Sequence, residues 1–154
     1  MPAVPGLRSP YVKVGRVVYF GRMLDKIRLH AAGKLPAEYV ANVGDATPGM
    51  FDTRCCAFLR IRYSELREAV LSKSLADEPA LAWAEERGGR RSDEECTVWN
   101  GFMTKRGWRD EANARLKTRN KENGFADARV LTMFDYIDFD EGRDPVTQRV
   151  WETV

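Results

Sequence analysis

The stretch Val17–Ala32, with the sequence VVYFGRMLDKIRLHAA, decides the fold. Its apolar residues recur every three or four positions, which is the period of an α-helix, and Gly33 and Pro36 follow where a helix would end. Val18 and Leu29 lie on the opposite side, around a group of charged residues. A helix that is apolar on both sides is central to its fold, so the sequence predicts a helical domain packed around residues 17–32. The recurring apolar residues are Val17, Phe20, Met23, Leu24, Ile27 and Ala31.

Three charged residues, Arg22, Asp25 and Lys26, lie on the side of this helix that is bracketed by apolar residues. Charges in a central helix are partly buried and need partners. Arg22 and Asp25 are spaced i,i+3 and can pair within the helix. Two interpretations follow. Either Arg22 and Lys26 hold the carboxylate or phosphate of a ligand, or the charges form an internal ion-pair network that fixes helix packing.

Capping signals and periodicity predict further helices. Ser92-Asp-Glu-Glu95 is a capping box with acidic residues in the first turn, and the helix that it opens runs to about Arg106. Residues 34–49 carry turn residues and are expected to form a loop. Together these patterns predict one compact all-α domain of about five to seven helices. The other expected helices cover residues 50–59, 64–72, 77–88, 110–124 and 127–141.

The chain divides into three expected parts. Residues 1–16 contain three prolines and two glycines, and we expect an extended N-terminal arm that lies over the body. Residues 17–141 form the helical domain. Residues 142–154 follow a Gly-Arg-Asp-Pro stop and are expected to be a short irregular or hairpin tail.

Composition excludes several classes of protein. The 154 residues are 44% hydrophobic and 31% charged, which is typical of a globular domain and excludes a disordered chain. The net charge of +2 is too small for a protein that grips many phosphates, so we do not expect nucleic acid as the partner. The lone histidine excludes a multi-histidine zinc site, and three cysteines without C-x-x-C spacing indicate reduced thiols. No signal peptide or membrane span is present, so we expect a cytoplasmic protein that does not bind membranes.

The sequence contains no recognised catalytic motif. The phosphate-binding loop, the dinucleotide fingerprint, the zinc-protease motif and the hydrolase nucleophile elbow are all missing. The sequence therefore carries no assignment as an enzyme, and we expect neither a cofactor nor a metal site.

A second group of bracketed charges lies in the last expected helix. Asp135 and Asp138 share one side of this helix, between apolar residues, and the string lacks the pattern of a calcium loop. Charge complementarity makes three cations elsewhere in the chain their expected partners, namely Arg22, Lys26 or Arg106.

Trp99 and Arg106 lie on one face of the helix that the capping box opens. In one interpretation, Trp99 anchors the core and Arg106 is a structural clamp whose stem packs on the apolar face. In the other, the two side chains form one wall of a ligand site.

Several strings, read together, resemble one protein family. The chain is similar over nearly its whole length to the bacterial family catalogued as domain of unknown function 5069. The resemblance implies a small, predominantly helical protein and assigns no activity. The strings that carry it are Arg8-Ser-Pro10, Gly21-Arg-Met-Leu-Asp-Lys26, Ala32-Gly-Lys34, Tyr39, Trp99, Lys105-Arg-Gly107 with Asp110, and Met133-Phe-Asp-Tyr-Ile-Asp138.

Three classes of function remain open. The chain binds a small anionic ligand, or it is a protein-interaction or homo-oligomeric scaffold whose charges are structural, or it binds nucleic acid through basic segments. We favour the first class, because charges bracketed by apolar residues recur on two helices. The candidate ligand-binding residues are Arg22, Asp25, Lys26, Tyr39, Trp99, Arg106, Asp135 and Asp138.

Overall fold

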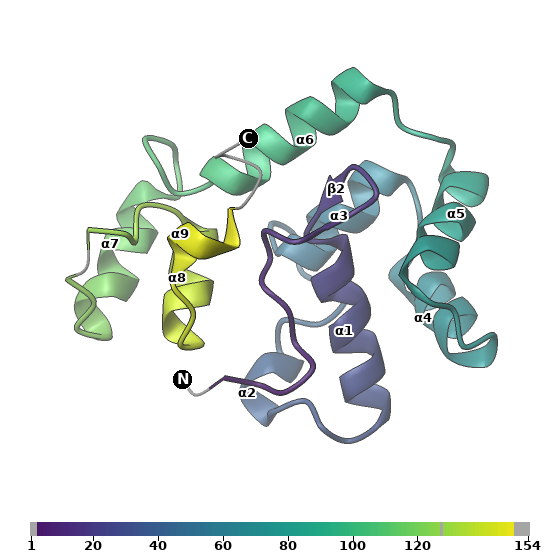
Figure 1. The fold of residues 1–154 in the computed structure, drawn as a ribbon, viewed down its shortest axis with the longest axis horizontal. Helices are drawn as coiled ribbons and strands as arrows, with labels where there is room; N and C mark the ends of the chain where they lie inside the picture. The colour runs from purple at the N-terminus through teal and green to yellow at the C-terminus, as the bar shows by residue number, and fades with distance from the viewer. Residues whose placement is uncertain (1–2, 127, 150–154) are drawn as a thin grey trace.

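The computed structural model of the chain describes residues 3–126 and 128–149. Within these ranges it contains nine helices and one two-stranded sheet (Figure 1). The all-α prediction is confirmed in outline, but the helices outnumber the five to seven expected because two of them, α2 and α9, are single turns, which show no sequence period. The helices are α1 Phe20–Ala31, α2 Ala37–Val40, α3 Phe51–Leu59, α4 Tyr63–Ser72, α5 Asp77–Gly88, α6 Asp93–Lys105, α7 Asn113–Glu122, α8 Met133–Asp140 and α9 Pro145–Gln148.

Helix α1 is the central element. All eight residues from Phe20 to Ile27 are buried, which agrees with the apolar pattern on both sides of this helix. Figure 1 shows α4 and α5 on one side of α1, α7 and α8 on the other, and α6 across the top. The main core cluster lies around α1 and includes apolar side chains from α3, α4, α5, α6 and α8.

Helix α1 begins at Phe20 rather than at Val17. Residues Val17–Val18 form strand β2, which pairs antiparallel with β1, Lys13–Val14. Gly15 supplies the left-handed backbone of the turn, with φ +57°. The two valines suit a strand, and their pairing partner comes from the N-terminal arm, which the helical period of the sequence does not reveal.

Two capping boxes fix the starts of α6 and α8. The predicted box is confirmed, because the Ser92 hydroxyl accepts from the Glu95 N–H and the Glu95 carboxylate accepts from the Ser92 N–H. A second box joins Thr132 and Asp135 in the same way. This second box starts α8 at Met133, so the helix expected from residue 127 is shorter than predicted.

The remaining boundaries differ by a few residues. Helix α7 begins at Asn113, because the Asp110 carboxylate accepts from the Gly107 and Ala112 N–H groups and closes a turn before the helix. The expected loop over 34–49 contains α2. In the tail, residues 145–148 form α9 rather than a hairpin, with the Asp144 side chain as its cap; residues 150–154 lie outside the described part.

The N-terminal arm is tied to the helices by charged groups. Arg8 donates to Asp25 at 2.7 Å and to Asp77 at 2.7 Å, which links the arm to α1 and α5. The Ser9 hydroxyl donates to the Asp138 carboxylate of α8 at 2.7 Å. Asp25 therefore pairs with Arg8, and with Arg28 at 3.6 Å, so the expected pairing of Arg22 with Asp25 is wrong.

A cavity above a buried ion-pair network

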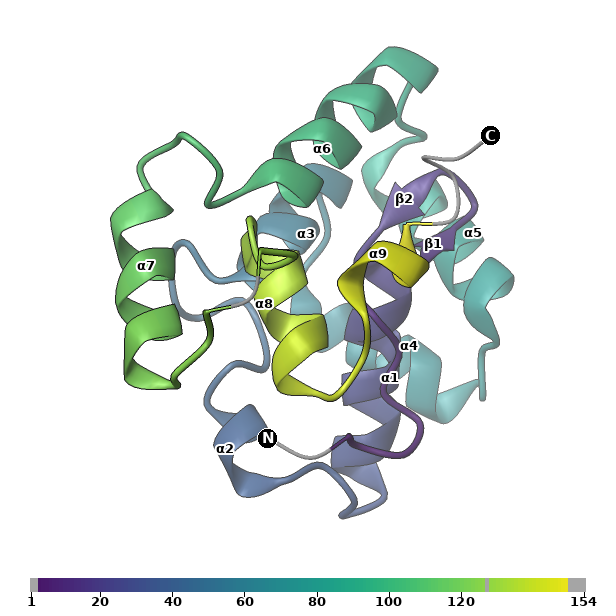
Figure 2. The same ribbon diagram turned by 60° about the vertical axis from the view of Figure 1, so that its left-hand side comes forward.

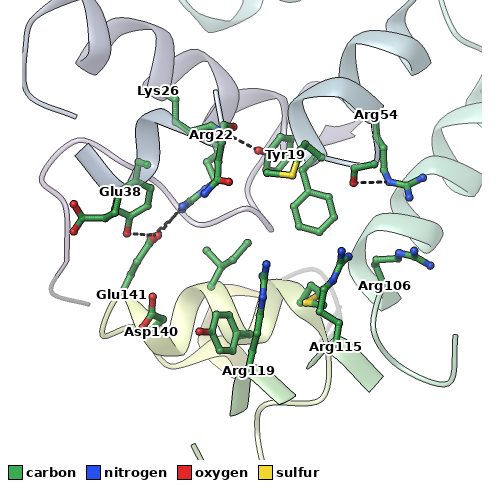
Figure 3. A pocket seen from close by; sticks show the side chains of 18 of the residues that line it. Tyr19, Arg22, Lys26, Glu38, Arg54, Arg106, Arg115, Arg119, Asp140 and Glu141 are labelled. Carbon is green, nitrogen blue, oxygen red and sulfur yellow. Dashed lines mark hydrogen bonds and ion pairs between the residues drawn. The ribbon is translucent and has the colours of Figure 1, made fainter. Parts of the chain in front are cut away.

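A cavity of about 310 Å³ lies between α1, α2, α3, α7 and α8 (Figure 3). Figure 2 shows α8 lying between α7 and α1, so that segments far apart in sequence surround this space. Four of the residues selected from the sequence line the cavity: Arg22, Lys26, Tyr39 and Arg106. The other four lie elsewhere in the fold.

Glu141 neutralises Arg22 on the inner wall of the cavity. The guanidinium of Arg22 donates to both carboxylate oxygens of Glu141, at 2.9 Å and 2.6 Å. Tyr39 and Arg143 also donate to Glu141, at 2.9 Å and 2.7 Å. Burial alone would raise the pKa of Glu141, but these donors hold that pKa below its ordinary value. The charge of Arg22 is thus satisfied within the protein.

Lys26 is neutralised in the same way. Its ammonium donates to Asp52 Oδ1 at 2.6 Å, to Tyr19 Oη at 2.9 Å and to the Asn42 carbonyl at 3.1 Å. Burial lowers the pKa of Lys26, an effect that the Asp52 carboxylate opposes. An ammonium has three donors, and all three are used here, so Lys26 offers none to a ligand.

Tyr19 completes the inner wall. Its hydroxyl donates to Asp52 at 2.7 Å, and burial together with this carboxylate raises the pKa of Tyr19 well above its ordinary value. Its backbone is left-handed, with φ +72°, which is a strained conformation for a bulky residue. The strained turn between β2 and α1 places the ring against Phe51 and Phe134, whose centroids lie 5.5 Å and 6.0 Å away.

Four arginines form the other end of the cavity. Arg54 belongs to α3, Arg106 follows α6, and Arg115 and Arg119 are spaced i,i+4 on α7. Figure 3 shows Arg54, Arg106 and Arg115 gathered at one end, with Arg119 beside them toward the middle. Arg115 and Arg119 are exposed, whereas Arg54 and Arg106 are half-buried.

These four arginines differ in their partners. Arg106 pairs with Asp110 at 3.3 Å and Glu111 at 3.1 Å. Arg54 donates to the Gly49 carbonyl at 3.2 Å. Among residues 3–126 and 128–149, no carboxylate lies within ion-pair distance of Arg54, Arg115 or Arg119. Among the described residues, the positive charge at this end is thus not balanced by a carboxylate, and it is carried by Arg54, Arg115 and Arg119.

The opposite end of the cavity is acidic. Glu38 of α2 and Asp140 of α8 line it, and Figure 3 shows both on the side away from Arg54 and Arg115. The wall between the two ends is apolar and aromatic. The cavity therefore has two polar ends of opposite charge, and its intervening wall is formed by Met50, Phe51, Met133, Tyr136 and Ile137.

Trp99 lies in the core, away from the cavity. Its indole N–H donates to the Val18 carbonyl at 3.3 Å, and its ring stacks on Phe58 with centroids 4.7 Å apart. Asp25 also lies away from the cavity, in the pairing with the arm described above. Both residues are buried parts of the packing around α1 and α6.

Asp135 and Asp138 have partners other than those expected. Asp135 accepts from Tyr11 at 2.6 Å and pairs with Arg149 at 2.6 Å. Asp138 pairs with Arg143 at 3.2 Å, besides accepting from the arm. Burial raises the pKa of Asp138 to about 6, although its hydrogen bonds oppose this. The expected partners, Arg22, Lys26 and Arg106, are wrong for both carboxylates.

The sequence patterns did not select three of the cavity's arginines as part of this site. Arg115 and Arg119 belong to a basic helix that is typical of a solvated face or a nucleic-acid contact. Arg54 is the single basic residue of a short helix. Only the folded structure groups these three arginines, because α3 and α7 are distant in sequence and line the same cavity.

Within residues 3–126 and 128–149, no helix is long and apolar enough to cross a bilayer. No group of three or more metal-ligating side chains comes together in the same part of the chain.

The fold and the site together define a class: a helical domain in which a buried ion-pair network supports a cavity with an arginine-rich end. The chain belongs to the family described as Domain of unknown function (DUF5069), which matches residues 4–143. The match covers the arm, the network and the four cavity arginines. No curated protein matches the chain.

Proposed function

We propose that this protein binds a small anionic ligand in the cavity between α1, α3, α7 and α8. The observation that carries the proposal is that Arg54, Arg115 and Arg119 line the same cavity and have no carboxylate partners among the described residues. Guanidinium groups donate forked hydrogen bonds that match carboxylate and phosphate groups. An anion at this end of the cavity would receive guanidinium donors that have no carboxylate partner among the described residues.

Arg22 and Lys26 have a different part in this proposal. Their charges are neutralised by Glu141 and Asp52, so they shape the inner wall instead of holding the anion. Breaking either pair to serve a ligand would leave a buried carboxylate unpaired, which costs several kcal/mol. The anchors are therefore the outer arginines, and Arg106 packs over the Phe102 ring, which Arg54 also contacts.

The size of the cavity limits the ligand. Small-molecule sites have volumes of roughly 300–1,000 Å³, and this one lies at the lower end. The occupant is thus a metabolite-sized molecule.

A thermal-shift panel of phosphates, nucleotides and small carboxylic acids tests the proposal. An anion at about 100 times its Kd adds about 2.7 kcal/mol, or roughly 5–10 °C for a domain of this size. The informative variant is Arg115→Gln with Arg119→Gln, which should abolish the shift. The matched control is Lys117→Gln with Lys121→Gln, which removes the same charge from the same helix outside the cavity. A flat panel on folded protein, or equal shifts in both variants, would reject the proposal.

A second candidate is self-association through α6. Val98 and Phe102 are spaced i,i+4 on this helix and are 62% and 39% exposed, and Trp108 beyond its end is 43% exposed. Exposed apolar and aromatic side chains are typical of interfaces. Sedimentation equilibrium of wild type and Val98→Glu tests this scaffold function: a concentration-dependent mass that the variant loses would favour it over the ligand site.

A further inference from the structure

We propose that the ligand is a small phosphate monoester. This inference rests on the anion-binding function proposed above and names the chemical class that the same cavity selects. Three features carry it: the number and directions of the guanidinium groups, the charge of the surrounding segment, and the polar groups at the opposite end.

The arginines reach the cavity from two helices. Arg54 comes from α3, and Arg115 and Arg119 come from α7, on the other side of the cavity (Figure 3). A carboxylate has two oxygens in one plane, and one or two guanidinium forks satisfy it. A phosphate monoester has three terminal oxygens and a charge of about −1.5 to −2, so it accepts forks from several directions. Three guanidinium groups without carboxylate partners among the described residues match a phosphoryl group better than a carboxylate.

The charge of the surrounding segment also favours a multiply charged anion. Residues 105–122 hold seven Lys and Arg residues against three Asp and Glu residues, a net charge of +4. The whole chain carries +2, so the remainder carries −2. Arg106, Arg115 and Arg119 belong to this basic segment and line the cavity. A positive electrostatic potential raises the local concentration of anions by a factor that grows exponentially with their charge, which favours a dianion over a monocarboxylate.

The opposite end of the cavity selects the organic part of the ester. Glu38 and Asp140 are hydrogen-bond acceptors there, and a second phosphate at this end would be repelled. Hydroxyl or amino groups on the organic part would instead donate to these carboxylates. The apolar wall, which includes Phe51 and Ile137, suits the carbon skeleton between the two ends. Sugar phosphates and nucleoside monophosphates share this chemistry.

Isothermal titration calorimetry on the full chain distinguishes the ligand classes. The ligands are glucose 6-phosphate, AMP, inorganic phosphate, gluconate and citrate. At least one ester should bind about tenfold or more tightly than either carboxylate and than inorganic phosphate. Tighter binding of glucose 6-phosphate identifies a sugar phosphate, and tighter binding of AMP identifies a nucleotide.

The variants of α7 supply the control. Arg115→Gln with Arg119→Gln should weaken ester binding about 100-fold, because each charge-assisted hydrogen bond accounts for about tenfold. Lys117→Gln with Lys121→Gln should change the Kd by less than about threefold, since these lysines act only at long range. Circular dichroism confirms that both variants are folded.

The outcomes separate this inference from the function on which it rests. If gluconate or citrate binds as tightly as the esters, and only the arginine variant loses both, the anion site stands and the phosphate inference fails. If inorganic phosphate binds as tightly as the esters, the acidic end selects nothing and the monoester inference fails. If nothing binds, or if both variants weaken binding equally, the inference and the proposed function fail together.

Discussion

Replacing Glu141 by Gln tests whether the inner wall of the cavity is structural. The Glu141 carboxylate is buried and accepts from Arg22, Tyr39 and Arg143. Gln is nearly isosteric and keeps one acceptor oxygen, but it removes the negative charge. The guanidinium of Arg22, itself 4% exposed, would then be a buried charge without the carboxylate that pairs with it.

The expected cost follows from this burial. Removing one partner of a buried ion pair typically destabilises a protein by about 3–5 kcal/mol, because the remaining charge is desolvated and uncompensated. For a domain of about 150 residues, each kcal/mol lowers Tm by about 2–4 °C. We therefore expect Glu141→Gln to lower Tm by roughly 6–20 °C. Urea denaturation followed by tryptophan fluorescence measures the corresponding change in the free energy of unfolding.

Two further variants make this experiment decisive. Glu122→Gln removes an exposed carboxylate on α7 and should change stability by no more than about 0.5 kcal/mol. Adding Arg22→Met to Glu141→Gln removes the unpaired cation, so the double variant should be more stable than Glu141→Gln alone. If Glu141→Gln costs no more than the exposed control, or if the double variant is the less stable one, Arg22 does not depend on Glu141 and the structural interpretation of this pair is wrong.

Three other predictions concern stability. Because burial raises the pKa of Asp138 to about 6, the native state holds an extra proton between about pH 4 and 6, and wild type loses stability as pH rises through this range. Asp138→Asn should therefore gain about 3 kcal/mol relative to wild type between pH 4 and 7 in urea denaturation, and a constant difference would contradict this. Gly88→Ala would place a Cβ 1.8 Å from the Leu59 carbonyl oxygen, so we expect a loss of about 3 kcal/mol or more in thermal unfolding, whereas unchanged stability would refute the close packing of α5 on the end of α3. Ser92→Ala removes the cap of α6 and should cost about 1 kcal/mol, and Ser92→Thr, which keeps the hydroxyl, should recover most of it.

The sequence predicts helices well where their signals are local. Helix α5 was expected over residues 77–88 and has these bounds, and α3 differs from its expected range by one residue. The capping box of α6 lies within four residues, so its geometry follows from the sequence alone. The prediction that Val17 and Val18 are helical is wrong, because they pair with a strand in the arm. Their apolar side chains fit the helical period of the residues that follow, so the period alone does not separate the strand from the helix.

The partners of buried charges were predicted poorly, because they are distant in sequence. Arg22 and Glu141 are 119 residues apart, and Lys26 and Asp52 are 26 apart. The sequence indicates that such charges need partners but contains many carboxylates that could supply them. The pairing of Arg22 with Asp25 that the i,i+3 spacing allows does not form, again because a residue distant in sequence intervenes. Arg8, in the N-terminal arm, donates hydrogen bonds to both carboxylate oxygens of Asp25.

The pattern that identified Arg22 and Lys26 also explains why neither residue is left to bind a ligand. A charge bracketed by apolar residues becomes buried, and a buried charge without a partner costs several kcal/mol, so the fold supplies a carboxylate to each. A cation that has no partner until a ligand binds has to remain partly solvated, since water stabilises its charge in the ligand-free protein. Arg54, Arg115 and Arg119 meet this condition, because they are half-buried or exposed and line the same cavity. In this domain, bracketed charges belong to the buried support of the cavity, and the cations that we propose as contacts for an anion lie on helix faces that look ordinarily solvated in the sequence.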